Sequence, residues 1–277
     1  MITNTPVPIK SLGSREWDST AYHRISAPQF SWGKKVMDRL SLRGSETVLD
    51  AGCGTGKLTR ELLELLPNGR VFALDVSLNM LRAARANLAD HFGKKVQFIA
   101  ADLIVMPFRE LFDGIFSTAA FHWVTDHDRL FQALYRALKP GGWLVAQCGG
   151  AGNLDRFLGR LAILAKTPEF SNYLAGFRNP WVFSDAPTTR QRLEAVGFIE
   201  VETSLEEAPT RFDTAKQFSE FTSKIILHRH LERLPDQDLR CDLLRQLAEL
   251  AAHDDPPFEL DYWRLNLNAK KPVVITE

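Results

Sequence analysis

Three glycines at alternate positions mark the stretch of this sequence with the clearest capacity to bind a ligand. Gly52, Gly54 and Gly56 follow an apolar run that ends in Asp50 and Ala51. A side chain at one of these glycines would hold the backbone away from a ligand or strain the turn. In open α/β sheets such a loop joins a strand to a helix, and the ligand lies at the carboxyl ends of the strands. The loop therefore predicts a binding turn.

Two nucleotide-binding fingerprints fit this loop only in part. The dinucleotide pattern Gly-x-Gly-x-x-Gly requires a glycine where Lys57 stands. The P-loop pattern requires Ser or Thr after Gly-Lys, where Leu58 stands, and a glycine at Ala51. Both fits are therefore imperfect.

Acidic residues follow two further segments of strand type. Asp75 ends the apolar segment 70–75, where a carboxylate can accept hydrogen bonds from both ribose hydroxyls of a nucleoside. Asp75 is also placed to cap the next helix, but Ser77 can fill that role and leave Asp75 for the ribose. Asp102 follows the segment 96–100, and can accept from an adenine amino group or serve as an ordinary turn aspartate.

Aromatic residues and histidines form three further groups. His122 and Trp123 follow the predicted strand 112–118, and His122 is either a general base or a ring packed beside Trp123. Trp17 and Tyr22 either pin the N-terminal segment to the core or belong to a lid over the ligand. The run 228–230, His-Arg-His, has no acidic or Cys partner nearby, so a solvated helix face is expected there and no metal site is predicted.

The elements that position these residues alternate between strands and helices. Strands are predicted at 47–51, 70–75, 96–100, 112–118 and 143–147, with helices at 57–66, 78–90 and 128–138 between them. This order predicts a parallel, doubly wound α/β sheet. Past residue 150 helices are expected at 153–166, 187–196, 214–233 and 236–252, and alternating strands at 198–203 and 258–267.

The composition limits the partners and the compartment. Hydrophobic residues make up 45% and charged residues 25% of the 277 residues, which is usual for soluble globular proteins. Lys plus Arg and Asp plus Glu both number 34, so no net charge favours nucleic acid or an anionic membrane. The three cysteines are scattered, and neither a signal segment nor an apolar run of membrane-spanning length is present. We expect a cytoplasmic protein with no membrane partner.

The string Asp-Ala-Gly-Cys-Gly-Thr-Gly at 50–56 resembles motif I of the class I S-adenosylmethionine-dependent methyltransferases almost letter for letter. Similar segments at 75–81, 101–103 and 138–142 extend the resemblance. It implies a mostly parallel seven-stranded Rossmann-like sheet with a helical cap, S-adenosyl-L-methionine as cofactor and S-adenosyl-L-homocysteine as product. The cofactor-binding residues that it implies are Trp17, Tyr22, Asp50, Ala51, Gly52, Gly54, Gly56, Asp75, Val76, Met80, Asp102 and Leu103.

Within that family, the segment 119–127 is similar to the branch of trans-aconitate and juvenile-hormone-acid methyltransferases. This resemblance implies that Gln29 and Trp123 hold the carboxylate of a small-molecule acceptor, which is methylated at oxygen. Three alternatives stay open. The acceptor is a phenol or alcohol with His122 as the base, or an acyl group on a carrier protein, or the chain binds the cofactor without transferring its methyl group. The oligomeric state, monomer or homodimer, is also open.

The predicted organisation is one methyltransferase domain over 1–277 with four parts. Residues 1–45 form an N-terminal lid segment, in which 1–16 are a mobile lead-in, and 46–150 form the cofactor-binding core. A mostly helical cap covers 151–257 and contributes a strand near 198–203 to the sheet edge. Residues 258–277 are the last strand and a tail.

Overall fold

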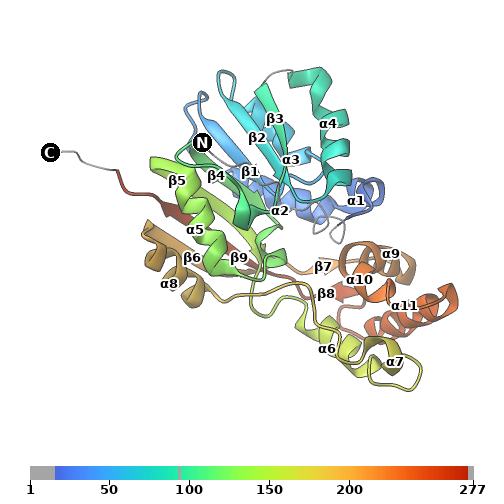
Figure 1. Cartoon of the computed structure of the whole chain (residues 1–277). Helices are drawn as coiled ribbons and strands as arrows, with labels where there is room; N and C mark the ends of the chain where they lie inside the picture. Colours follow the sequence, from blue (N-terminus) through green and yellow to red (C-terminus); the bar gives the residue numbers. More distant parts are fainter. Residues whose placement is uncertain (1–15, 93–94, 274–277) are drawn as a thin grey trace, which may run out of the picture.

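The computed structural model describes residues 16–92 and 95–273, except the side chains of residues 21, 22, 25 and 89–92. The predicted lead-in therefore lies almost wholly outside the described residues. Two parts are visible in Figure 1: a sheet covered by helices, and a helical cap beside the carboxyl ends of its strands.

The seven-stranded sheet has the order β3-β2-β1-β4-β5-β9-β6. Neighbours from β3 to β5 are parallel, and β9 runs antiparallel between β5 and β6. The predicted fold class is therefore confirmed. The strands are β1 Thr47–Ala51, β2 Arg70–Asp75, β3 Val96–Ala100, β4 Phe112–Thr118, β5 Leu138–Gly149, β6 Ile199–Glu207 and β9 Trp263–Lys270.

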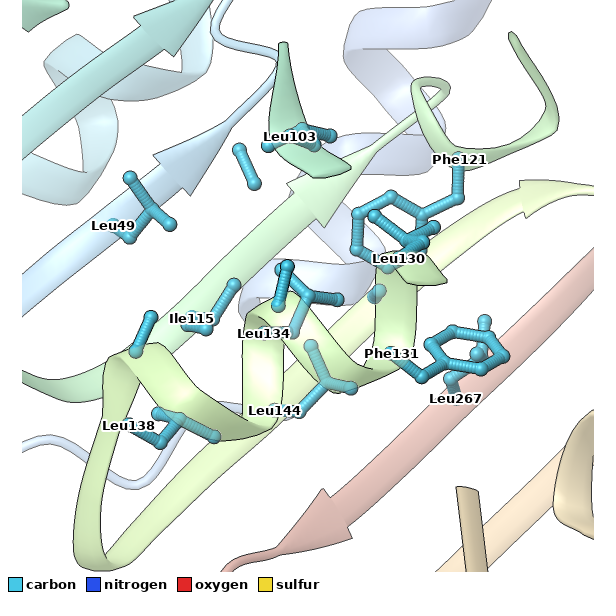
Figure 2. Close-up of a cluster of buried hydrophobic side chains, with 14 of the residues drawn as sticks. Leu49, Leu103, Ile115, Phe121, Leu130, Phe131, Leu134, Leu138, Leu144 and Leu267 are labelled. Carbon is cyan, nitrogen blue, oxygen red and sulfur yellow. The ribbon is translucent and has the colours of Figure 1, made fainter. Parts of the chain in front are cut away.

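The sheet is covered on both faces by helices of its crossover connections. On one face Leu49, Ile115 and Leu144 pack with α5 His127–Ala137 and α8 Ala186–Val196 in one buried cluster. Figure 2 shows Leu130, Phe131 and Leu134 of α5 within this cluster. Burial on both faces explains why the strands read as continuous apolar runs.

The opposite face packs against the helices that precede and follow the first two strands. Val48, Val71 and Phe116, adjacent in sequence to residues of the first face, belong to this second cluster. Because strand side chains alternate, each central strand supplies both clusters. The helices here are α2 Ala27–Met37, α3 Lys57–Glu64 and α4 Leu78–Phe92, and the short α1 Ser19–Ile25 precedes them.

The predicted strands 47–51, 70–75, 96–100 and 112–118 coincide with β1 to β4, and the predicted fifth strand lies within the longer β5. Residues 139–142 form a bulge in β5, since Phe112 pairs with Leu138 but Gly114 pairs with Trp143. The helix predicted at 187–196 is α8, which ends at Gly197 with a φ of 108°.

The cap has a hydrophobic core of its own, which includes Phe157, Phe218 and Leu243. A two-stranded sheet of β7 and β8 joins it to the seven-stranded sheet (Figure 1). Its elements are α6 Asp155–Leu164, α7 Ser171–Leu174, β7 Thr210–Arg211, α9 Ala215–Phe221, the π-helical turn η6 Thr222–Ile226, α10 His228–Leu231, α11 Gln237–Ala252 and β8 Glu259–Leu260.

Two expectations for this region are wrong. The strand predicted at 258–267 is divided into β8 and β9, because the chain turns at Asp261, whose carbonyl and carboxylate accept the backbone N–H groups of Leu154 and Arg156. The run 228–230 is not a solvated face. His230 is 3% exposed, its ring lies 4.5 Å from Phe177, and its Nε2 lies 3.2 Å from the side-chain oxygen of Asn179.

In the described part of the chain, no helix is both long and apolar enough to cross a membrane.

Candidate functional site

A cavity of about 170 Å³ lies at the carboxyl ends of the first four strands. We call it the cofactor cavity, since a parallel α/β sheet places its ligand there. Of the predicted cofactor-binding residues it brings together Trp17, Gly52, Gly54, Asp75, Val76, Met80, Asp102 and Leu103.

The glycine loop after β1 is held by backbone hydrogen bonds to β2. The N–H groups of Gly52 and Cys53 donate to the carbonyl of Leu74 at 2.8 and 2.9 Å. Gly52 has a φ of 90°, and a Cβ there would lie 2.4 Å from the Cβ of Ala120. Only glycine therefore lets this loop lie against the segment after β4.

Three residues of the predicted set lie beside the cofactor cavity rather than in its wall. Ala51 is fully buried in β1, and a Cβ on Gly56 would meet Leu88 of α4, so Gly56 lets α3 pack closely on α4. Asp50 is 2% exposed and lines a smaller neighbouring cavity with Gln29. It accepts a 2.6 Å hydrogen bond from the Thr59 hydroxyl, and burial raises its pKa to about 7.

Asp75 combines a structural role with a position in the cavity wall. One carboxylate oxygen accepts the Gly54 N–H at 2.9 Å and the other accepts the Ser77 N–H at 2.8 Å. Ser77 itself caps α4, because its hydroxyl accepts the Met80 N–H at 3.2 Å. Burial raises the pKa of Asp75, and the two N–H donors oppose that shift. A carboxylate has about four acceptor sites, so these two bonds leave capacity for ribose hydroxyls.

The far end of the cofactor cavity is apolar apart from Asp102. Met80 and Leu103 are buried, and Val76 lines the cavity with them. Asp102 accepts the Ile104 N–H at 3.2 Å and thereby caps the short helix η4 Leu103–Val105. Asp102 can therefore cap this turn, as predicted, and still lie in the cavity wall where an adenine amino group is expected.

The N-terminal segment lines both the cofactor cavity and a second cavity that adjoins it and is described below. The Glu16 carboxylate accepts from the Ser77 hydroxyl and the N–H groups of Leu78 and Asn79 at the start of α4. Trp17 lines the cavity, with its ring 5.0 Å from Trp123 and 4.4 Å from His228. This placement fits the lid interpretation of Trp17. The side chain of Tyr22 lies outside the described part of the structure.

A second cavity, of about 50 Å³, adjoins the cofactor cavity, and we call it the acceptor cavity. The two share Trp17, Ala119 and Trp123 in their walls. All three residues predicted to act on the acceptor line it, namely Gln29, His122 and Trp123. Further wall residues are Trp32, Asn153, Leu154, Trp181, Phe183, Ile225, Ile226, Tyr262 and Arg264.

Ala119 marks the point where the cavities meet. It lines the cofactor cavity, the acceptor cavity and the small cavity beside Asp50. Its φ of 53° lies in the left-handed region, which alanine rarely adopts and which costs about 1–3 kcal/mol. Backbone strain of this kind is concentrated at functional sites.

His122 has a defined tautomer. The Gly149 N–H donates to its Nδ1 at 3.3 Å, so that nitrogen carries a lone pair and the neutral ring carries its proton on Nε2. Desolvation lowers the pKa of His122 well below its usual value, and the positive charge of Arg264 adds to this. The ring is therefore a neutral N–H donor at neutral pH, and its Nδ1 is engaged by the backbone.

Several residues in these walls were absent from the predicted site. Arg264 lies on β9, where the alternation of side chains suggests a solvent face, but it is buried in the wall of the acceptor cavity against Trp32 of α2. His228 and Arg229 line the cofactor cavity from the cap. One available signal was the density of aromatic residues at 181–183 and 262–263. Among the described residues no cluster of His, Cys, Asp or Glu could hold a metal ion.

A family model described as a methyltransferase domain matches residues 48–142, from β1 into β5. The trans-aconitate 2-methyltransferase of Deinococcus radiodurans is 28% identical over 228 residues, which cover 80% of this chain and 85% of that protein. The trans-aconitate 2-methyltransferase of Azoarcus sp. (strain BH72) is 35% identical over 131 residues, 47% of this chain and 50% of that protein. The chain thus spans about half the length of the second relative.

Among solved structures, phosphoethanolamine N-methyltransferase 2 of Haemonchus contortus, in complex with S-adenosylhomocysteine, superposes with a TM-score of 0.62 at 20% identity. The match covers 96% of this chain and 61% of that chain, and it shows a shared fold. Family model, relatives and fold agree: residues 48–142 carry a methyltransferase domain, and the chain resembles the class I S-adenosylmethionine-dependent methyltransferases, among them the trans-aconitate 2-methyltransferases.

Proposed function

We propose that this enzyme methylates a carboxylate oxygen of a small-molecule acceptor. The residues of the cofactor cavity fit S-adenosylmethionine: Asp75 retains acceptor capacity for a ribose, and a Cβ on Gly54 would enter otherwise open space. When bound, S-adenosylmethionine supplies a sulfonium methyl group, whose transfer to a carboxylate leaves S-adenosylhomocysteine and a neutral ester with no proton to remove.

The observation that carries this proposal is the state of His122. An alcohol or phenol acceptor requires a base, and His122 is the candidate that the acceptor cavity offers. Its Nδ1 accepts the Gly149 N–H, and its Nε2 holds the proton of the neutral ring. A proton acceptor is therefore lacking at this ring, whereas an N–H donor suits an acceptor that is already anionic.

Gln29 and Trp123 support the same acceptor. Both line the acceptor cavity, and both carry a side-chain N–H group that can donate to a carboxylate. Gln29 also lines the small cavity beside Asp50 and the glycine loop, so it lies between the acceptor cavity and that loop. The family's reaction needs positioning more than acid–base chemistry, and positioning can supply about 7–11 kcal/mol of the barrier. The relatives named for trans-aconitate, which bears carboxylates, favour this class.

The pH dependence of the rate tests the proposal. With a carboxylic acid as acceptor, kcat/KM should be flat between about pH 6 and 9, because the acid ionises near pH 4. Product formation is followed by the mass of the methyl ester and by release of S-adenosylhomocysteine. In His122→Ala the rate should fall, because an N–H donor is lost, without any change in the shape of the profile.

The contrary outcome is equally specific. Methylation of an acceptor that lacks an acid group, with a rate rising through a pH of about 6.5, would identify a base. A loss of about 10²–10⁴-fold in His122→Ala on that acceptor would make His122 this base. Binding of S-adenosylmethionine with no methyl transfer to any acid in a metabolite extract would mean that the chain binds the cofactor without transferring its methyl group.

A further inference from the structure

The acceptor cavity contains a buried cation. Arg264 is 3% exposed, and its guanidinium lies 4.5 Å from the ring centroid of Trp32. On β9 it is the register partner of Gly149, whose N–H donates to His122, so Arg264 and His122 belong to the same end of the cavity. The positive charge of Arg264 contributes to the lowered pKa of His122.

The wall of this cavity is otherwise uncharged over its described residues: Arg264 is the only one among them with a permanent charge, and none is acidic. Glu206, its register partner on β6, is exposed, and its carboxylate accepts from the Asn266 amide. An anion that enters the cavity therefore meets a cation in a desolvated setting, where charge-assisted hydrogen bonds are about twice as strong as neutral ones.

The remaining wall is aromatic. Trp181 and Phe183 are stacked with centroids 5.9 Å apart, Trp123 meets Trp181 edge-on at 5.4 Å, and Trp32 meets Tyr262 at 5.0 Å. These rings belong to segments far apart in the sequence and enclose a narrow space of about 50 Å³. Flat, unsaturated groups pack favourably against such ring faces and edges, whereas several charged groups would lose hydration without partners.

Resting on the proposed carboxylate methylation, we propose that Arg264 binds the carboxylate of the acceptor and that this acceptor is a monocarboxylic acid with a flat aromatic or conjugated body. Arg264 thus discriminates acids from alcohols and amides of the same shape. The single cation in the described wall matches one carboxylate, and the aromatic rings take the rest of the molecule. A tricarboxylate such as trans-aconitate is expected to be a poor acceptor, in contrast to the acceptor named for the relatives.

The test measures methyl transfer to three probes of graded chemistry: trans-cinnamate, the neutral trans-cinnamamide and trans-aconitate. We expect the methyl ester of trans-cinnamate, no competition by the amide at equal concentration, and at most a trace of product from trans-aconitate. Arg264→Gln should raise KM for trans-cinnamate by about 10- to 100-fold, with a smaller effect on kcat. The KM of Arg264→Lys should lie between those of the wild type and Arg264→Gln, because lysine keeps the charge but lacks the planar guanidinium group.

Two controls keep the readouts separate. S-adenosylmethionine binding by calorimetry should be unchanged in Arg264→Gln, because Arg264 does not line the cofactor cavity. The exposed Arg129 on α5 lines neither cavity, so Arg129→Gln should leave KM unchanged. If Arg264→Gln fails to fold, the wild-type enzyme still tests recognition of the charge, because trans-cinnamamide should not compete with trans-cinnamate.

Each contrary result has one meaning. Equal KM values for wild type and Arg264→Gln would overturn the role of Arg264 while leaving carboxylate methylation intact. The same holds if trans-cinnamamide competes with trans-cinnamate at equal concentration. Faster methylation of trans-aconitate than of trans-cinnamate would overturn the proposed acceptor class alone. Cofactor binding without methylation of any acid would instead refute the proposed function.

Discussion

At the scale of single residues, Asp75 connects the glycine loop, the helix after β2 and the cofactor cavity. Its two oxygens each accept one backbone N–H, from Gly54 and from Ser77. The carboxylate is thus oriented before a ligand arrives, and its remaining acceptor sites face the cavity that it lines. Preorganisation of this kind reduces the entropy that binding must overcome.

Replacement of Asp75 should remove most of the affinity for S-adenosylmethionine. In Asp75→Ala the Kd should rise by at least about 100-fold, because both ribose hydroxyls lose a charged acceptor. Asp75→Asn should also weaken binding, since an amide cannot accept from Gly54 and Ser77 at once. Calorimetry measures both values, and Asp238→Ala, an exposed acid on α11, is the control. Wild-type affinity in Asp75→Ala would remove this residue from the site.

At the scale of elements, the segment that contains Glu16 and Trp17 is the part best placed to respond to ligands. It is attached to the start of α4 through Glu16, and the Trp17 ring packs against the rings of both Trp123 and His228. These contacts bring together the N-terminus, the segment after β4 and the cap. A cofactor under Trp17 would add contacts to all three.

Binding of S-adenosylmethionine should therefore slow amide hydrogen exchange in residues 16–32. The expected protection reflects reduced local opening of a segment that lies at the edge of the cavity. Mass spectrometry with and without the cofactor measures it, and α8, on the face of the sheet away from α1 to α4, is the internal reference. Equal exchange in both states would mean that Trp17 is only a core anchor.

At the scale of the whole molecule, stability and ligand binding draw on the same buried groups. Asp50 lies beneath the glycine loop and is almost fully buried, with a pKa of about 7. In the unfolded chain this carboxyl ionises near pH 4, so between pH 4 and 7 the folded state binds the extra proton. This group therefore contributes stability that is present below pH 4 and lost as the pH rises through 7.

We therefore expect the free energy of unfolding of the wild type, relative to Asp50→Asn, to fall between pH 4 and 7 by up to about 1.4 kcal/mol per pH unit. Buried His228 and His230, with pKa values of about 4, give the opposite slope in both proteins and cancel in the difference. Urea titrations at four pH values without cofactor measure it. A difference that is constant with pH would show that Asp50 stays ionised.

The sequence determined the local parts of this fold. Strands β1 to β4 and α8 are placed by signals that lie within a few residues, such as apolar runs, the glycine loop and the Pro and Gly at the ends of a helix. The position of a ligand at the carboxyl ends of the strands, and the acids Asp75 and Asp102 beside it, follow from the order of these elements.

Only the tertiary structure decided the acceptor cavity. Its wall is assembled from residues between Trp17 and Arg264, including α2, the segment after β4, η6 and β9. Arg264 alternates with Leu265 and shares its strand face with Asn266, a pattern typical of a solvent face, and His228 lies on a short polar helix. Their burial depends on contacts with residues distant in sequence, Trp32 for Arg264 and Trp17 and Trp123 for His228. The spacing of residues along one strand or helix carries no information about such contacts.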